Sequence, residues 1–233
     1  MIQDFANLRY YQEYLNVPID PHNAYFKETD FLEMEDQDFD KPKNYYAAVD
    51  FAISGNSRAD RTVITVGGVD SDNTLNIEYV LIGRWDAKQI VDEMISVQRR
   101  FDIDIFTVES GMIEKSIGPY LNDEMMRTGV FLNLNKEVPT KDKETRARSI
   151  QARMRAGGVK FDTDASWYDE LHDEMLVFPR GKHDDIVDSM AWLGLTLDKF
   201  ATAPTIEEKA DEEWEEEFGE MVELVGISAT TGY

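Results

Sequence analysis

The chain has 233 residues, of which 42% are hydrophobic, so it can bury a sizeable core in one large domain or two small ones. It contains no cysteine, which excludes disulfides and thiolate metal sites and agrees with a reducing cytosol. No segment reaches the roughly 18 apolar residues of a membrane span, and the N-terminus lacks a secretory signal, so we expect no membrane association. The formal net charge of −23 argues by itself against a nucleic-acid partner.

The charge is unevenly distributed along the chain. Residues 207–223 contain ten acidic side chains and one lysine, whereas residues 136–155 contain seven Lys or Arg against three Asp or Glu. One basic segment therefore lies within an acidic protein. The acidic tail is expected to be a solvated charge run, either helical or disordered, and it is also a candidate occupant of the basic groove as a DNA mimic.

The pattern divides the chain into three parts. Residues 1–43 combine a short amphipathic helix, over 1–16, with a turn-rich acidic linker that holds three prolines. Residues 44–200 carry the periodic segments of a folded domain, and residues 201–233 form the acidic tail.

Within the domain, three strands come first and then strands alternate with helices. This order predicts an α/β fold with a mixed sheet whose first three strands are antiparallel. The expected strands are 45–53, 61–69, 75–85, 101–110, 130–134 and 157–161, and the expected helices are 87–100, 113–127, 143–156, 167–176 and 183–200. No GxxxxGK[ST] or GxGxxG loop is present, so the chain is not an NTPase by itself.

Two carboxylates lie on expected strands. Asp50 interrupts the apolar run YYAAVDFAI, where a buried charge costs several kcal/mol unless it is paired or bound to a metal. Glu109 follows IFTV at the carboxyl end of its strand, where ligands bind in α/β sheets. The alternatives are that Asp50 ends its strand and caps a turn, and that Glu109 is an ordinary exposed strand-end residue.

Three aspartates, Asp184, Asp185 and Asp188, open the last apolar helix, in GKHDDIVDSMAWLGL. Capping and the helix dipole account for two of them, but Asp188 lies on the same face as the other two, where like charges repel. No Lys or Arg occurs between His183 and Asp198 to compensate. The sharper hypothesis is a divalent metal, because Mg²⁺ prefers carboxylate oxygen and a metal pair can clamp a phosphoryl transfer. His183 either tunes such a site or simply begins the helix.

The order of strand Asp, strand-end Glu and HDD at the head of an apolar helix resembles the RNase H-like nucleases, and most closely the nuclease domain of the large terminase of tailed bacteriophages. YQEYLN with the following proline resembles the segment that joins the terminase motor to its nuclease. KETRARSIQARMRAGGVKF resembles the basic helix and strand of the family, and KHDDIVDSMAWL resembles its final acidic motif.

The resemblance implies a metal-dependent endonuclease that cleaves concatemeric viral DNA during genome packaging, in the cytoplasm of an infected bacterium, with two Mg²⁺ or Mn²⁺ ions. It implies that Asp50 bridges both ions, Glu109 binds one and Asp185 the other, with Asp184 and Asp188 as auxiliary metal-site residues and Asp60 as a further carboxylate near the site. The basic residues expected to contact phosphates of double-stranded DNA are Lys141, Lys143, Arg146, Arg148, Arg153 and Arg155.

The implied partners are the terminase ATPase motor, the small terminase subunit and the portal protein. The motor half is missing from this sequence, as expected for a chain cut to the nuclease domain or for a free-standing relative. Two other functions stay open. One is a Holliday-junction resolvase or transposase-like nuclease, and the other is a non-catalytic module that docks on a portal or motor, its carboxylates being caps and surface charge.

Overall fold

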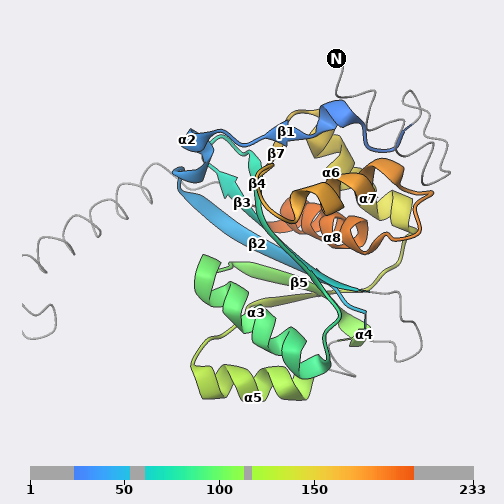
Figure 1. The fold of residues 1–233 in the computed structure, drawn as a ribbon. Helices are drawn as coiled ribbons and strands as arrows, with labels where there is room; N and C mark the ends of the chain where they lie inside the picture. The colour runs from blue at the N-terminus through green and yellow to red at the C-terminus, as the bar shows by residue number, and fades with distance from the viewer. Residues whose placement is uncertain (1–23, 53–60, 113–116, 202–233) are drawn as a thin grey trace, which may run out of the picture.

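A computed structural model describes residues 24–52, 61–112 and 117–201 of the chain. These residues form a mixed seven-stranded sheet with helices on both faces (Figure 1). The helix expected over residues 1–16, the acidic tail and Asp60 lie outside the described residues. No helix in the described ranges is long and apolar enough to cross a membrane.

The sheet has the strand order β1-β7-β4-β3-β2-β5-β6. Strands β2, β3 and β4 pair antiparallel, and the remaining neighbours pair parallel. The strands are β1 (Leu32–Glu33), β2 (Lys43–Asp50), β3 (Thr62–Asp70), β4 (Leu75–Gly83), β5 (Ile105–Glu109), β6 (Leu134–Glu137) and β7 (Val159–Phe161). The helices are η1 (Glu28–Asp30), α2 (Asp36–Phe39), α3 (Ala87–Phe101), α4 (Ser110–Met112), α5 (Gly118–Thr128), α6 (Lys143–Arg155), α7 (Tyr168–Val177) and α8 (Asp185–Phe200).

The predicted α/β fold and its mixed sheet are confirmed, and the antiparallel trio is preceded by the short β1. Several predicted strand boundaries are wrong, and the strand expected from residue 101 begins only at Ile105, because α3 extends to Phe101. The apolar run suggested that the first strand continues to residue 53, but β2 ends at Asp50. The strand expected over 130–134 begins only at Leu134, because α5 runs to Thr128, Gly129 caps it in a left-handed conformation, and the next residues lead the chain back to the sheet edge.

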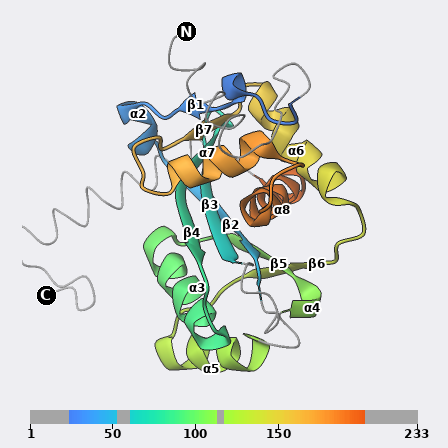
Figure 2. The ribbon, with the colours of Figure 1, turned by 45° about the vertical axis from the view of Figure 1, so that its right-hand side comes forward.

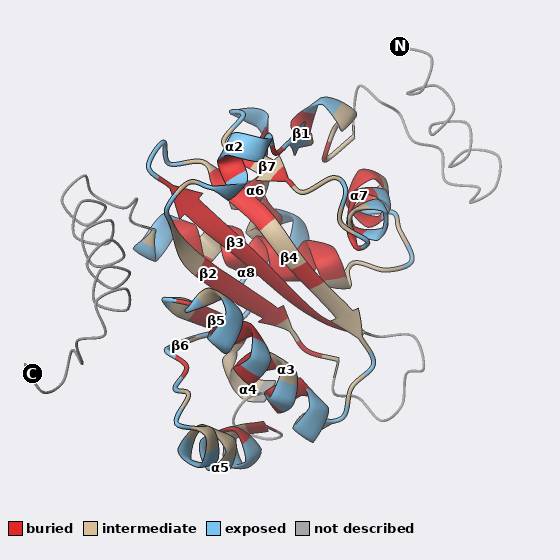
Figure 3. Cartoon of the chain, turned by 60° about the vertical axis from the view of Figure 1, so that its left-hand side comes forward, coloured by how far each residue is buried: buried red, intermediate tan, exposed pale blue. Residues whose placement is uncertain are grey.

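Alternation along the strands assigns side chains to two cores. On β2, Tyr46 and Ala48 belong to the core beneath α6, α7 and α8, whereas Ala47 and Val49 belong to the core beneath α3 and α5. The two helical layers lie on opposite faces of the sheet (Figure 2), and the central strands between them are almost wholly buried (Figure 3). By the same period of two, Asp50 falls on the α8 face.

Helices α6 and α8 approach closely at Gly194. A Cβ atom at this position would lie 2.8 Å from the backbone nitrogen of Ile150 on α6. Glycine usually costs about 1 kcal/mol in a helix interior relative to alanine. Here the absence of a Cβ atom lets the backbones of α6 and α8 approach closely. The basic helix α6 therefore packs directly against α8.

Residues 24–43, part of the expected linker, pack onto the domain. Phe26 is fully buried in the core with Phe178, and β1 adds to the edge of the sheet beside β7. The division of the chain at residue 43 stays a prediction, but this part of the segment contributes to the core.

A buried carboxylate fixes α2 to the sheet. Asp38 is fully buried and accepts hydrogen bonds from Lys160 on β7 (2.6 Å), the Glu35 backbone nitrogen (2.9 Å) and Lys41 (3.1 Å). Burial alone would raise the pKa of Asp38, but the hydrogen bonds from Lys160, Glu35 and Lys41 lower it to about 2.

We expect Asp38→Ala to lower the free energy of unfolding by about 3 kcal/mol at neutral pH, because Lys160, Lys41 and the Glu35 backbone nitrogen all lose their buried acceptor. The stabilisation by Asp38 is present above the ordinary aspartate pKa and is lost as the pH falls toward 2. Urea unfolding at pH 7 and pH 3 measures both effects. Asp36→Ala, on the exposed side of α2, is the matched control and should change stability little. Equal effects of the two substitutions would contradict the assignment.

Candidate active site

The register of two parallel strands places Asp50 and Glu109 side by side. In the β2–β5 pair, Val49 lies opposite Val108, so the next residues are neighbours at the carboxyl ends of both strands. Both fall on the α8 face, because Ala48 on β2 and Thr107 on β5 contact that helix. The two carboxylates singled out in the sequence therefore meet at one edge of the sheet.

Helix α8 brings its own carboxylates to the same edge. Ser189, one turn into the helix, hydrogen-bonds to the carbonyl oxygen of Ala48 (3.1 Å) and to Thr65 Oγ1 (2.9 Å), with all three groups buried. These contacts fix the first turns of α8 over the end of β2. As a result, Asp185 and Asp188 lie close enough to Asp50 to act on its ionisation.

The Asp50 carboxyl lies in a strongly negative environment. Burial raises its pKa well above the usual range, and the negative charges of Asp188, Asp185 and Glu109 raise it further, with Lys143 opposing. Among the described residues, no side chain donates a hydrogen bond to the Asp50 carboxyl or forms an ion pair with it. Asp50 is only partly exposed, and ionising a desolvated carboxyl among like charges is unfavourable, so this position favours a bound proton or cation.

Asp188 is compensated from another helix, which corrects the sequence analysis. Lys143 on α6 lies 2.7 Å from one oxygen of Asp188 and 2.7 Å from Asp184, and Arg146 lies 2.5 Å from the other oxygen of Asp188. Along α8 itself, no Lys or Arg lies between His183 and Asp198. The cations come instead from a much earlier segment of the chain, which the sequence analysis reserved for DNA.

The start of α8 is capped by a residue that the sequence analysis missed. Asp184 occupies the N-cap position but makes no capping bond with its side chain. Glu174 on α7 does so instead, accepting hydrogen bonds from the backbone nitrogens of Ile186 (2.6 Å) and Val187 (3.2 Å). Burial raises the pKa of Glu174 to about 7, against the opposing effect of these hydrogen bonds. Only the tertiary packing of α7 on α8 reveals this role.

Arg61, just before β3, connects Glu174 to the cluster. Its guanidinium donates to Glu174 (2.7 Å), to Asp185 Oδ2 (3.2 Å) and to Glu170. Arg61 side-chain exposure is only 11%, so these contacts lie largely within the protein. Arg61 was not predicted as a site residue, because nothing in its local sequence distinguishes it from an exposed turn residue.

The remaining predicted residues are placed as follows. His183 is half-buried beside Asp184 and makes no hydrogen bond or ion pair with another described residue. On α6, Arg153 donates to the carbonyl of Asn73 and Arg155 to that of Tyr25. Lys141 and Arg148 are exposed and pair with no side chain in the described ranges. Their role in binding DNA stays a prediction.

The donor set suits a hard divalent ion. Asp50 and Glu109 have no competing cation among the described residues, and Asp185 uses only Oδ2 toward Arg61. In the described ranges, no three acidic or histidine side chains stand close enough together to hold an ion without some rearrangement. The fit therefore rests on the chemistry of the carboxylates and on the excess negative charge at Asp50.

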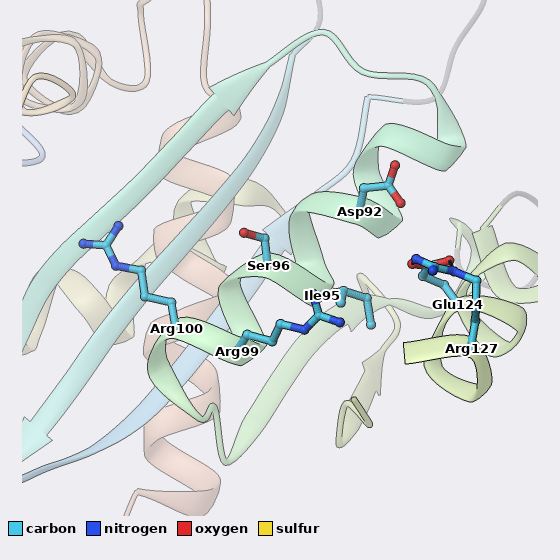
Figure 4. Close-up of a pocket in the computed structure, with 7 residues that line it drawn as sticks. All are labelled: Asp92, Ile95, Ser96, Arg99, Arg100, Glu124 and Arg127. Carbon is cyan, nitrogen blue, oxygen red and sulfur yellow. Dashed lines mark hydrogen bonds and ion pairs between the residues drawn. The ribbon is translucent and has the colours of Figure 1, made fainter. Parts of the chain in front are cut away.

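A separate pocket lies between α3 and α5, on the opposite face of the sheet from α8 (Figure 4). Its polar lining mixes both charges, and Arg127 pairs with Glu124 within it. The pocket shares no residue with the acidic cluster. Its lining residues are Asp92, Ile95, Ser96, Arg99, Arg100, Glu124 and Arg127.

Comparison with solved structures identifies the fold. The chain is similar to the large terminase nuclease of the thermophilic phage G20c, with a TM-score of 0.50 and 16% identity over 68% of this chain and 83% of that one. It is also similar to the HK97 bacteriophage large terminase, with a TM-score of 0.51 and 12% identity over 72% of this chain and 41% of that one. The large terminase of another thermophilic bacteriophage, solved in complex with ADP, gives a TM-score of 0.51 at 8% identity, over 74% of this chain and 43% of that one.

No family model matches the sequence, and no curated protein matches it. The similarity to solved structures shows that the chain has the RNase H-like fold of large terminase nuclease domains. The resemblance seen in the sequence is confirmed at the level of the fold.

We expect Glu174→Ala to lower the free energy of unfolding by about 2–3 kcal/mol, because two backbone N–H groups of α8 lose their acceptor and Arg61 loses one of its three carboxylate partners. Glu174→Gln keeps an acceptor for the backbone and should lose less. Glu170→Ala is the control, since Glu170 also contacts Arg61 but is 53% exposed. Thermal or urea unfolding measures the three variants, and a loss as large for Glu170→Ala as for Glu174→Ala would rule out the capping role.

Proposed function

We propose that this chain is a metal-dependent endonuclease that hydrolyses phosphodiester bonds of double-stranded DNA and cleaves concatemeric viral DNA during genome packaging. The observation that carries the proposal is that Asp50, Glu109 and Asp185, from β2, β5 and α8, lie at one sheet edge, where the partly buried Asp50 carboxyl has no ion-pair partner among the described residues. The fold shared with large terminase nucleases supports it.

The three carboxylates have distinct proposed roles. Asp50 would bridge two Mg²⁺ or Mn²⁺ ions, with Glu109 holding one and Asp185 the other. Bound ions of this kind lower the pKa of water and stabilise the charge that develops on the scissile phosphate. Arg61 orients Asp185 by taking one of its oxygens, and Ser189 keeps the helix that carries Asp185 against the sheet.

The same proposal supplies partners and a setting. The chain spans only 41% of the HK97 large terminase and 43% of the ADP-bound large terminase. This partial coverage supports a nuclease domain that acts together with another domain. We assign that domain to an ATPase motor, with the small terminase subunit and the portal as further partners, in the cytoplasm of an infected bacterium.

DNA would approach over α6. Lys141, just before α6, and Arg148, on it, are exposed and have no partner side chain in the described ranges, so they are the first candidates for phosphate contacts. Lys143 and Arg146 also lie on α6 but are already paired with carboxylates of α8. Arg153 and Arg155 bond backbone carbonyls and would support the helix as well as the DNA.

We expect Asp50→Asn, Glu109→Gln and Asp185→Asn each to lower cleavage of supercoiled plasmid with Mn²⁺ or Mg²⁺ by at least roughly a hundredfold, because each removes a charged metal ligand. EDTA should abolish cleavage by the parent. Asp198→Asn, at the exposed far end of α8, is the control and should cleave like the parent.

Two outcomes would contradict the nuclease assignment. If the parent cuts no plasmid with either metal, a non-catalytic docking module is favoured. If the three variants cut as fast as the parent, the activity belongs elsewhere. A four-way DNA junction included beside the plasmid distinguishes a resolvase, which would cut the junction in preference to the linear arms.

We expect the double variant Lys141→Ala/Arg148→Ala to bind duplex DNA roughly tenfold more weakly at low salt, with a shallower dependence of affinity on salt by about 2, because two phosphate contacts are lost. Fluorescence anisotropy at several salt concentrations measures this change. Lys88→Ala/Arg99→Ala removes the same charge from the α3 face, where Figure 4 places Arg99. An equal loss of affinity in this control would show that net charge, and not α6, determines binding.

A further inference from the structure

The three aspartates at the start of α8 differ in what they already bind. Asp188 has both oxygens occupied, Oδ1 by Arg146 at 2.5 Å and Oδ2 by Lys143 at 2.7 Å. Asp185 has one contact, from Arg61 to Oδ2, and its Oδ1 has no donor among the described residues. Sequence position alone makes the two residues equivalent, since both face the same side of the helix.

Arg146 is held firmly in this arrangement. Its side chain is 11% exposed, its guanidinium lies 5.1 Å from the centre of the Trp192 ring, and it also donates to the carbonyl of Lys141 at 3.2 Å. An arginine fixed on three sides pairs with Asp188 without having to order a free side chain, so the pair is not easily opened by a competing ion.

Lys143 completes the arrangement from the solvent side. Its ammonium bridges Asp188 and Asp184 at 2.7 Å each, and its side chain is 47% exposed. It is close enough to oppose the effect of the surrounding carboxylates on Asp50. Lys143 thus supplies a positive charge at the position where a metal would otherwise draw in Asp188.

We propose that Lys143 and Arg146 are positioning residues that withhold Asp188 from the metal ions, so that Asp185 is the ligand that α8 contributes beside Asp50 and Glu109. This inference rests on the proposed function. It reassigns the two basic residues from DNA binding to the control of metal affinity. The pair keeps the site from gathering so many carboxylates that it would hold its ions too tightly, or in the wrong place, for turnover.

Binding of Mn²⁺ alone, measured by isothermal titration calorimetry on the full chain, tests the proposal without relying on activity. We expect Lys143→Met to bind Mn²⁺ roughly tenfold more tightly than the parent, because a unit positive charge beside the site is removed and Asp188 is released. Adding Asp188→Asn to Lys143→Met should return the affinity toward that of the parent. The single variant Lys143→Arg, which keeps the positive charge, should bind Mn²⁺ with the affinity of the parent.

Matched variants separate this effect from net charge and from folding. Lys88→Met removes a lysine that pairs with Asp92 on α3, 3.0 Å apart, and should leave Mn²⁺ affinity unchanged. Asp185→Asn should weaken Mn²⁺ binding at least roughly tenfold, whereas Asp188→Asn alone should change it less than about threefold. Thermal unfolding of each variant confirms that the fold is retained.

The outcomes distinguish this inference from the proposed function. If the parent binds Mn²⁺ and Asp50→Asn weakens binding, but Lys143→Met binds no more tightly or Asp188→Asn loses as much as Asp185→Asn, the positioning role is overturned and the metal site stands. If the parent binds no Mn²⁺, or Asp50→Asn binds it equally well, the metal site itself is overturned, and the positioning role with it.

Discussion

The structure depends on the concentration of negative charge at the carboxyl ends of β2 and β5. Asp50 and Glu109 are placed there by strand register, and α8 adds its aspartates to the same edge. Like charges in a largely buried setting repel strongly unless cations or protons intervene. The neighbouring elements answer this constraint: α6 provides Lys143 and Arg146, and the start of β3 provides Arg61.

The positions of these cations make the charge of the cluster asymmetric. They neutralise the solvent side and the α7 side of α8, and they leave the edge that faces the strands negative. A uniform distribution of the same charges would stabilise the fold and offer nothing to an incoming ion. Stability and function thus compete at this edge, as is usual where a fold carries a site.

Much of this was predictable from the sequence, for reasons that particular residues show. Asp50 stood out because it interrupts an apolar run, and Glu109 because it ends one. The mixed sheet followed from the order of strands and helices. The charge partners did not follow, because Lys143, Arg61 and Glu174 reach α8 only through tertiary packing. The end of β2 at Asp50 was missed for a related reason, since apolar residues continue past it and nothing in their pattern shows where pairing with a neighbour stops.

The contact at Gly194 couples the acidic edge to a point on α8 that carries no charge. Helix α8 runs without interruption from Asp185 to Phe200, so Gly194 lies roughly 13 Å along the axis from Asp185. A side chain at Gly194 would lie too close to the Ile150 backbone, so α6 would have to shift relative to α8, and Lys143 and Arg146 would shift with it. Substitutions deep in this helix interface would then change the acidic edge at a distance. Such substitutions would resemble packing defects. Their effect, however, would come from a change in the electrostatic potential at the N-terminal end of α8.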